Sequence, residues 1–181
     1  MAAGKAPTIA VEVQRISEAT WLPSDQVFQR WVVAALTAAN EANPGLRPSG
    51  SMKPGSMKSG SLTIRLVDLD EGATLNSTWR HKAGPTNVLA FPGPTLPAGA
   101  GDPMIEYGDL VICLPVVQQE AVDQQKDPVN HLAHLVVHGT LHLLGHTHDA
   151  EADATCMEAL ETRVLAGLGI PDPYTSHGPP R

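Results

Sequence analysis

A histidine-rich stretch constrains this chain more than any other feature. It runs from His131 to Asp149 as HLAHLVVHGTLHLLGHTHD and holds six of the eight histidines of the chain. Its apolar residues before Gly145 are compatible with a helix. On such a helix His138 and His142 lie on the same face, because four residues make just over one turn. Gly145 suits the left-handed conformation that ends a helix, so we expect the chain to turn back there.

The spacing H-x3-H-x5-H predicts a metal site made of His138, His142 and His148. Three neutral imidazoles with no fourth ligand in the motif are typical of a catalytic zinc site, which keeps one position open. The motif lacks the Cys of a thiolate site and the several carboxylates of a Mg²⁺ or Ca²⁺ site. We therefore expect one Zn²⁺ per chain. For His131 and His134, on or near the same face, we expect ordinary packing roles, since three ligands suffice.

The same ligand frame also matches metzincin metalloproteases, which are therefore an alternative to be weighed. Proteases of this zincin type use a Glu directly after the first ligand as the general base. Here that position is Gly139. Proton transfer to the amine leaving group would then lack its usual agent, so Gly139 argues against peptide hydrolysis.

Length and charge set further bounds on the chain. Its 181 residues predict a single domain, 1–181, with a proper core. The net charge of −7 means that any site for a polyanion is a local patch.

Cys113 and Cys156 lie in apolar periodic segments and are predicted to be buried packing residues without a disulfide. No signal peptide or transmembrane run is visible, which predicts a cytoplasmic protein without a membrane partner.

The pattern of apolar residues predicts about four strands and about five helices. Strands are expected at 8–13, 62–68, within 84–92 and at 107–115, and helices at about 24–40, 69–79, 116–126, the histidine stretch and 151–167. A Gly/Ser/Pro-rich segment, 43–61, should be a flexible surface insertion, and 175–181 a tail. Because strands come early and helices late, we predict an α+β fold: a single small mixed sheet packed with helices, with the metal-binding helix in the core.

With these segments placed, four blocks of the sequence resemble the YbeY family of bacterial metal-dependent endoribonucleases, also called the rRNA maturation factor family. The blocks are LNSTWRHKAGPTNVLAFP (75–92), YGDLVICLP (107–115), HLVVHGTLHLLGHTH (134–148) and MEALETRVLAGLGIPDPY (157–174). They are similar to the family's LN-x-x-YR-x-K-x-x-PT(D/N)VLSFP block, its GDI-(V/I)-I strand, its HL-x-VHG-x-LHL-x-GYDH block and its ME-x-x-E-x-x-I-L-x-x-LG closing helix. The resemblance spans roughly Leu62 to Tyr174.

This resemblance implies a zinc endoribonuclease that cleaves single-stranded RNA. It implies work on ribosomal RNA, above all the 3′ end of the 16S RNA of the small subunit, and on ribosome quality control, with the small ribosomal subunit and its assembly factors as partners. Arg80 falls at the family's functional arginine, and a guanidinium near a metal-bound water can hold a phosphate and neutralise its growing charge. Arg80, His81 and Lys82 are expected to bind substrate on one wall of a cleft over the metal. A non-catalytic assembly factor stabilised by zinc is a further alternative.

The sequence departs from the family beside the third predicted ligand. The family's YDH reads His146-Thr147-His148 here, so the usual carboxylate is missing. A carboxylate that accepts the free N–H of a ligating imidazole fixes its orientation. We expect Thr147 and Asp149 to lie beside the ligands, and His146 to contact either a ligand or the substrate. We also expect zinc to be held more weakly than usual in the family unless Asp149 replaces the missing group.

Overall fold

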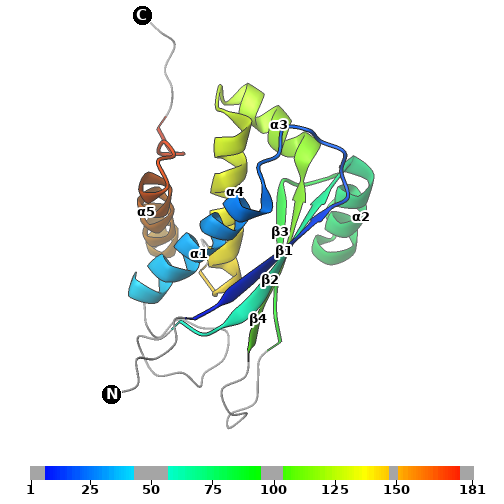
Figure 1. Cartoon of the computed structure of the whole chain (residues 1–181). Helices are drawn as coiled ribbons and strands as arrows, with labels where there is room; N and C mark the ends of the chain where they lie inside the picture. Colours follow the sequence, from blue (N-terminus) through cyan, green and yellow to red (C-terminus); the bar gives the residue numbers. More distant parts are fainter. Residues whose placement is uncertain (1–6, 43–56, 95–103, 147–150, 176–181) are drawn as a thin grey trace, which may run out of the picture.

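The computed structural model describes residues 7–42, 57–94, 104–146 and 151–175. Within these ranges it has a four-stranded mixed sheet and five helices (Figure 1), which confirms the predicted α+β fold. The strands are β1 (Ile9–Arg15), β2 (Gly60–Val67), β3 (Val88–Pro92) and β4 (Ile105–Cys113). The helices are α1 (Asp25–Ala42), α2 (Leu69–Arg80), α3 (Leu114–Asp123), α4 (Pro128–Leu143) and α5 (Glu151–Gly167).

The strand order in the sheet is β1-β2-β4-β3. β1 pairs with β2, and β2 with β4, in parallel, while β3 pairs antiparallel with β4. Among the described strands, β3 is therefore the last one on its side of the sheet and has β4 as its one neighbour. Its position matters because the cleft described below runs along it.

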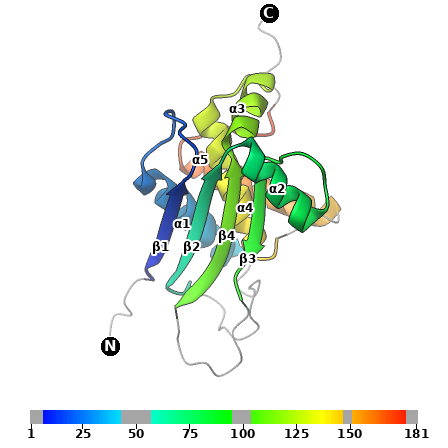
Figure 2. The ribbon, with the colours of Figure 1, turned by 90° about the vertical axis from the view of Figure 1, so that its right-hand side faces the viewer.

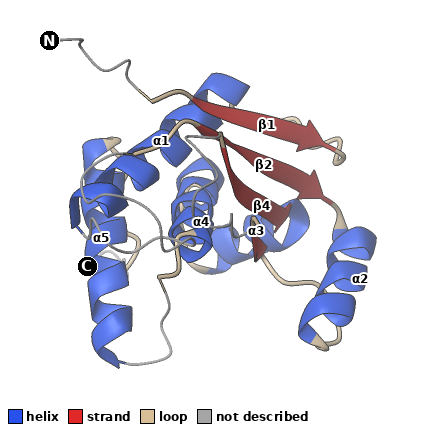
Figure 3. Cartoon of the chain, turned by 90° about the horizontal axis from the view of Figure 1, so that it is seen from below, coloured by secondary structure: helices blue, strands red, loops and turns tan. Residues whose placement is uncertain are grey.

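Helices cover both faces of the sheet. α1 and α4 pack on one face, α5 packs outside them, and α2 packs near β4 on the other face, as Figures 2 and 3 show from two directions. α4 thus lies between the sheet and α5, and ten of its sixteen residues are buried. This confirms the expectation that the histidine helix belongs to the core.

The apolar periodicity explains these packing faces. α1 buries Phe28, Trp31, Val32, Ala35 and Leu36, the stripe that its 3.6-residue period predicts. β2 alternates, and its Leu62, Ile64 and Leu66 side chains are buried in the same core. Among the described residues, no helix is both long enough and apolar enough to cross a bilayer.

Two details differ from the sequence predictions. Cys113 is buried as expected, but Cys156 is exposed, so its predicted packing role is wrong. Cys156 directly precedes the buried Met157 on α5, and adjacent helical residues point about 100° apart, which turns Cys156 away from the core.

The predicted insertion 43–61 is also too long, because Gly60 already begins β2. Residues 43–56 and the tail beyond Thr175 lie outside the described residues.

Candidate metal centre and active-site cleft

Local sequence fixes both ends of the histidine helix α4. The Asp127 carboxylate accepts hydrogen bonds from the backbone N–H groups of Val129 and Asn130, at 2.9 and 3.0 Å, and so caps the first turn. At the other end Gly145 has φ = 88°, the left-handed conformation that the sequence predicted. The Gly145 N–H donates to the His142 carbonyl, and the next N–H donates to the Leu141 carbonyl, which makes a Schellman ending.

The two histidines one turn apart on α4 form a preorganised pair. The Nε2 atoms of His138 and His142 are 3.1 Å apart. Two nitrogens at about 2.0–2.1 Å from one tetrahedral zinc ion are separated by about 3.3–3.4 Å, so the pair needs little adjustment to share a metal. The third predicted ligand, His148, and its neighbours Thr147 and Asp149 lie outside the described residues, so their roles stay predictions.

His146, the remaining candidate near the ligands, follows the Schellman turn. Its Nε2 atom is buried and has no hydrogen-bond partner among the described residues. Burial lowers the pKa of the imidazole, which favours its neutral form. A role of His146 beside the ligands stays a prediction.

A buried carboxylate from α5 supports the histidine pair. Glu161 is fully buried. One of its oxygens lies 2.6 Å from His138 Nδ1 and the other 2.9 Å from His134 Nε2, and the Tyr174 hydroxyl donates to it as well. Burial alone would raise the pKa of this carboxyl, but the hydrogen bonds from His134 and His138 outweigh burial, and the pKa falls to about 2.

The ionised state of Glu161 determines where the protons of its partners lie. A carboxylate only accepts hydrogen bonds, so His138 donates from Nδ1 and its Nε2 carries a lone pair when the ring is neutral. That lone pair is on the His142 side of the ring, where the two Nε2 atoms meet. A carboxylate that accepts the other N–H of the imidazole is the usual support of a metal-ligating histidine. Burial and the neighbouring Glu161 charge raise the pKa of Tyr174, so its hydroxyl stays a donor.

Glu161 also belongs to a second group that could bind a metal. Ligand atoms of His134, His138 and Glu161 all lie within 4.8 Å of one another. However, the 2.6 Å between His138 Nδ1 and Glu161 is shorter than the separation of about 3.3 Å expected for two ligands of one tetrahedral ion. This distance is typical of a charge-assisted hydrogen bond. The geometry therefore favours Glu161 as the partner that orients His138 over Glu161 as a ligand.

Glu161 was missed in the sequence, although a signal for it was there. It is the second Glu of the block that resembles the family's ME-x-x-E. It also lies four residues after Met157 and four before Leu165, on the buried stripe of α5. A carboxylate on an apolar stripe is rarely buried without a partner, so this position by itself indicated a polar contact inside the core.

His131 has the structural role that the sequence suggested. Its Nε2 lies 2.8 Å from a carboxylate oxygen of Glu120 on α3. The same carboxylate accepts from the side-chain amide of Asn87, at 3.1 Å to each oxygen. Burial tends to raise the pKa of Glu120, but the hydrogen bonds from His131 and Asn87 outweigh burial. The pKa of Glu120 is therefore lowered. This network joins α3, α4 and the start of β3 beside the cleft.

A cleft of about 650 Å³ runs along β3, between α4 and the end of α2. Its lining residues are Trp79, Arg80, Asn87, Val88, Leu89, Ala90, Phe91, Pro92, His138, Gly139 and His142. Arg80 thus lines the same cleft as His138 and His142, although it precedes both of them by more than fifty positions in sequence. His81 and Lys82 are exposed but are not among the lining residues. The predicted contact of His81 and Lys82 with substrate stays a prediction.

Asn76 shapes the turn that follows Arg80. Its buried side-chain amide donates to the Gly84 carbonyl at 2.8 Å and to the Lys82 carbonyl at 3.4 Å. His81 adopts a left-handed conformation with φ = 55° and ends α2. α2 therefore ends at Arg80, which directs the last residues of this helix toward the cleft.

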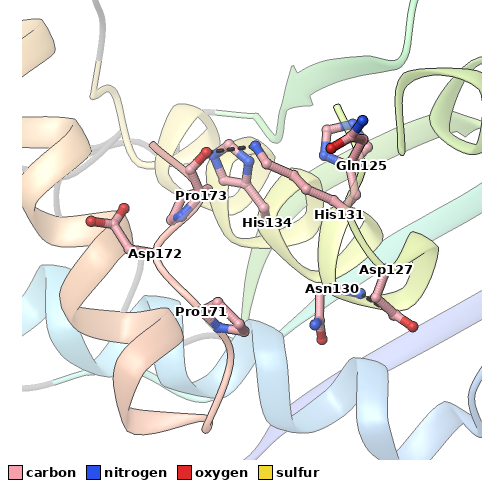
Figure 4. Close-up of a pocket in the computed structure, with 9 residues that line it drawn as sticks. Gln125, Asp127, Asn130, His131, His134, Pro171, Asp172 and Pro173 are labelled. Carbon is pink, nitrogen blue, oxygen red and sulfur yellow. Dashed lines mark hydrogen bonds between the residues drawn. The ribbon is translucent and has the colours of Figure 1, made fainter. Parts of the chain in front are cut away.

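A smaller pocket of about 180 Å³ lies between α4 and the segment after α5 (Figure 4). It is lined by His131 and His134 but by neither His138 nor His142. Lys126 Nζ donates to the Pro173 carbonyl at 2.6 Å and closes one side. This contact ties the segment after α5 to the turn before α4, and so helps to place Tyr174 against Glu161.

Gly139 lets α4 approach the sheet at the cleft. A Cβ at this position would lie 2.7 Å from Leu110 Cδ2 on β4 and 3.4 Å from Val88 Cγ2 on β3. Distances below about 3 Å force a neighbour to move, so the space next to His138 does not accommodate the Glu of a zincin protease without repacking. The structure thus adds a steric argument to the chemical argument against peptide hydrolysis.

Comparisons with known proteins identify the class of this site. The family model described as Endoribonuclease YbeY matches residues 24–169. Among curated relatives, Endoribonuclease YbeY of Alkalilimnicola ehrlichii is 46% identical over 176 residues, covering 96% of this chain and 95% of that protein. The protein of the same name from Alcanivorax borkumensis is 42% identical over 172 residues, covering 93% and 88%.

The chain therefore belongs to the YbeY endoribonuclease family, whose members are hydrolases of RNA. This confirms the resemblance seen in the sequence. Among solved structures, the chain is similar to the solution structure of TM1509 from Thermotoga maritima, with a TM-score of 0.52 at 18% identity, over 96% of this chain and 100% of that one. At this identity the likeness concerns the fold alone.

Proposed function

We propose that this protein is a zinc-dependent endoribonuclease that cuts single-stranded RNA in the cleft along β3. The observation that carries the proposal is that Arg80 and the His138–His142 pair line the same cleft. Family membership supplies the reaction class, and the cleft supplies a cation and two imidazoles at one place. We further propose that His148 completes the ligand set, with one zinc ion per chain.

The chain's own residues have distinct roles in this proposal. When bound, the metal supplies Lewis-acid polarisation of a phosphoryl oxygen, activation of water, or both. Glu161 keeps the His138 proton on Nδ1, so that the Nε2 lone pair stays available for the metal. Arg80 holds a phosphate through its guanidinium and neutralises the charge that develops on the phosphate during cleavage.

The substrate in the cell is proposed to be ribosomal RNA. The similarity of four sequence blocks to the rRNA maturation factor family supports the 3′ end of 16S rRNA as the target, and the small ribosomal subunit with its assembly factors as partners. The test is an incubation of purified protein with an unprocessed 16S 3′-end fragment, followed by mapping of the ends produced. We expect cleavage at one or a few unpaired positions. Uniform degradation, with no preference over an unrelated single strand, would contradict the rRNA role while leaving the nuclease activity intact.

Changing Arg80 to Ala should lower kcat for RNA cleavage by about 10²–10³-fold, as loss of one donor to a developing oxyanion does in other enzymes. Arg80→Lys should recover only part of this loss, because an ammonium group cannot hold a phosphate bidentately. Steady-state cleavage of a short single-stranded RNA measures both variants. Lys82→Ala is the matched control, since Lys82 is a nearby exposed cation outside the cleft, and its effect should be small.

Zinc content separates this role of Arg80 from a structural one. Arg80 is exposed and is not a predicted ligand, so Arg80→Ala should bind as much zinc as the unchanged protein. Loss of metal from this variant, measured by elemental analysis, would show that Arg80 maintains the site instead of contacting RNA.

A further inference from the structure

We propose that Trp79 is a stacking platform for one unpaired base of the RNA, beside the phosphate held by Arg80, and that it thereby sets the preference for single strands. This inference rests on the proposed function, because it assigns a substrate contact within the same cleft. It adds a specificity-determining residue that contacts a base, whereas Arg80 and the metal act on the phosphate.

Trp79 is exposed where such a contact would occur. Its side chain is 63% exposed, although it is a large apolar group. The other large apolar residues exposed in the described part of the chain are Ile16, Leu69, Met104, Val122 and Tyr174. None of these lines the cleft, whereas Trp79 does. An exposed aromatic ring next to the predicted reaction site is available for a base to stack on.

The indole ring is held in place and yet keeps a free face. It packs against Phe91 of β3 in an edge-to-face arrangement, with centroids 5.7 Å apart and the planes at 71°. Whichever ring presents its edge, this geometry leaves at least one face of Trp79 unused by Phe91. A ring fixed by a strand residue loses little further freedom when a base stacks on it, which favours binding.

The charge of the protein makes stacking a large part of RNA binding. The net charge is −7, and among the described residues that line the cleft Arg80 is the one Lys or Arg side chain. Few phosphates can be neutralised there, so counterion release contributes little to affinity. Stacking of a base on an aromatic ring does not depend on charge, and each such contact changes affinity by about 5- to 150-fold.

Stacking on Trp79 also accounts for discrimination against duplexes. A base inside a duplex is stacked between its neighbours and offers no free face. It reaches an aromatic platform only after unstacking and unpairing, which costs free energy. An unpaired base meets no such cost, and recognition by stacking is tolerant of sequence. Trp79 therefore favours unpaired RNA without reading which base it holds.

The first test compares variants by steady-state cleavage of one single-stranded RNA, free and annealed to its complement. Trp79→Ala should raise KM by about 10–100-fold with kcat little changed, because a contact made equally in the ground and transition states affects binding alone. The ratio of kcat/KM for the single strand to that for the duplex should fall by the same factor. Trp79→Phe should retain most of the wild-type values. Leu69→Ala is the matched control, since Leu69 is an exposed apolar residue at the other end of α2.

The second test locates the base and separates this inference from the proposed function. Binding is measured by anisotropy with a cleavage-resistant 2′-O-methyl strand, in which single nucleotides near the cut are made abasic. At one position the abasic strand should bind the wild-type protein more weakly than the intact strand does. Trp79→Ala should bind the abasic and intact strands equally well, so that the two losses do not add. Equal binding and cleavage by Trp79→Ala and wild type would overturn the inference alone. A wild-type protein that neither binds nor cleaves single-stranded RNA would overturn both the inference and the proposed function.

Discussion

Changing His142 to Ala should remove the bound zinc and lower RNA cleavage by about 10³-fold or more, whereas changing His134 to Ala should leave the zinc in place. The Nε2 atoms of His142 and His138 meet in the cleft, whereas His134 Nε2 faces the other oxygen of Glu161 and His134 lines the other pocket. A metal contributes several kcal/mol of transition-state stabilisation, and about 4 kcal/mol corresponds to about 10³-fold in rate. Zinc content by elemental analysis and cleavage of single-stranded RNA measure the two effects.

This pair of variants distinguishes the two candidate ligand groups. If the metal is held by His134, His138 and Glu161, the pattern reverses, and His134→Ala loses zinc while His142→Ala keeps it. That reversal would contradict the assignment made from the Nε2–Nε2 distance. His138→Ala belongs to both groups and should lose zinc in either case, which makes it the positive control for the assay.

Changing Glu161 to Ala should destabilise the protein, by about 1–3 kcal/mol for each donor that is left without its acceptor. The change leaves the partly buried N–H groups of His134 and His138 without their acceptor. It should also weaken zinc binding by about 10–100-fold, because His138 loses the carboxylate that orients it. Thermal unfolding of the metal-free protein and competition against a graded chelator report the two losses separately. Unchanged zinc affinity would mean that Glu161 does not act on the metal through His138.

Two further measurements isolate the charge of Glu161. Tyr174→Phe removes one donor to the carboxylate and should cost less, about 1–3 kcal/mol. The pKa of Glu161 is about 2, below its ordinary value of 4.5, so folding favours the ionised form. The resulting stabilisation is present above pH 4.5 and is lost as the pH falls toward 2. Between these values the stability of Glu161→Gln should therefore fall less steeply than that of the unchanged protein.

Features that depend on local sequence were predictable. The left-handed Gly145, the buried stripe of α1 and the shared face of His138 and His142 all follow from helical periodicity and backbone sterics over a few residues. The apolar alternation of β2 placed that strand, and the early strands and late helices indicated the fold class. The family resemblance added Arg80, whose distance from the histidines in sequence gave no sign that the two share a cleft.

Features that depend on tertiary packing were not predictable in the same way. The sequence pointed to Asp149 as the supporting carboxylate, because it is a neighbour of the predicted ligand His148 in sequence. The structure supplies that carboxylate from Glu161, twenty-three positions after His138, since α5 packs along α4. Likewise, His81 and Lys82 follow Arg80 directly, but the left-handed turn at His81 ends the helix, and neither lines the cleft.

We propose that this protein cuts RNA with a metal held in the β3 cleft. The most direct test is cleavage of a single-stranded RNA by protein stripped of metal with a chelator, and by the same protein after zinc is added back. We predict that the stripped protein is inactive, that about one zinc ion per chain restores cleavage, and that His138→Ala is not restored. Undiminished cleavage by the metal-free protein would contradict the account.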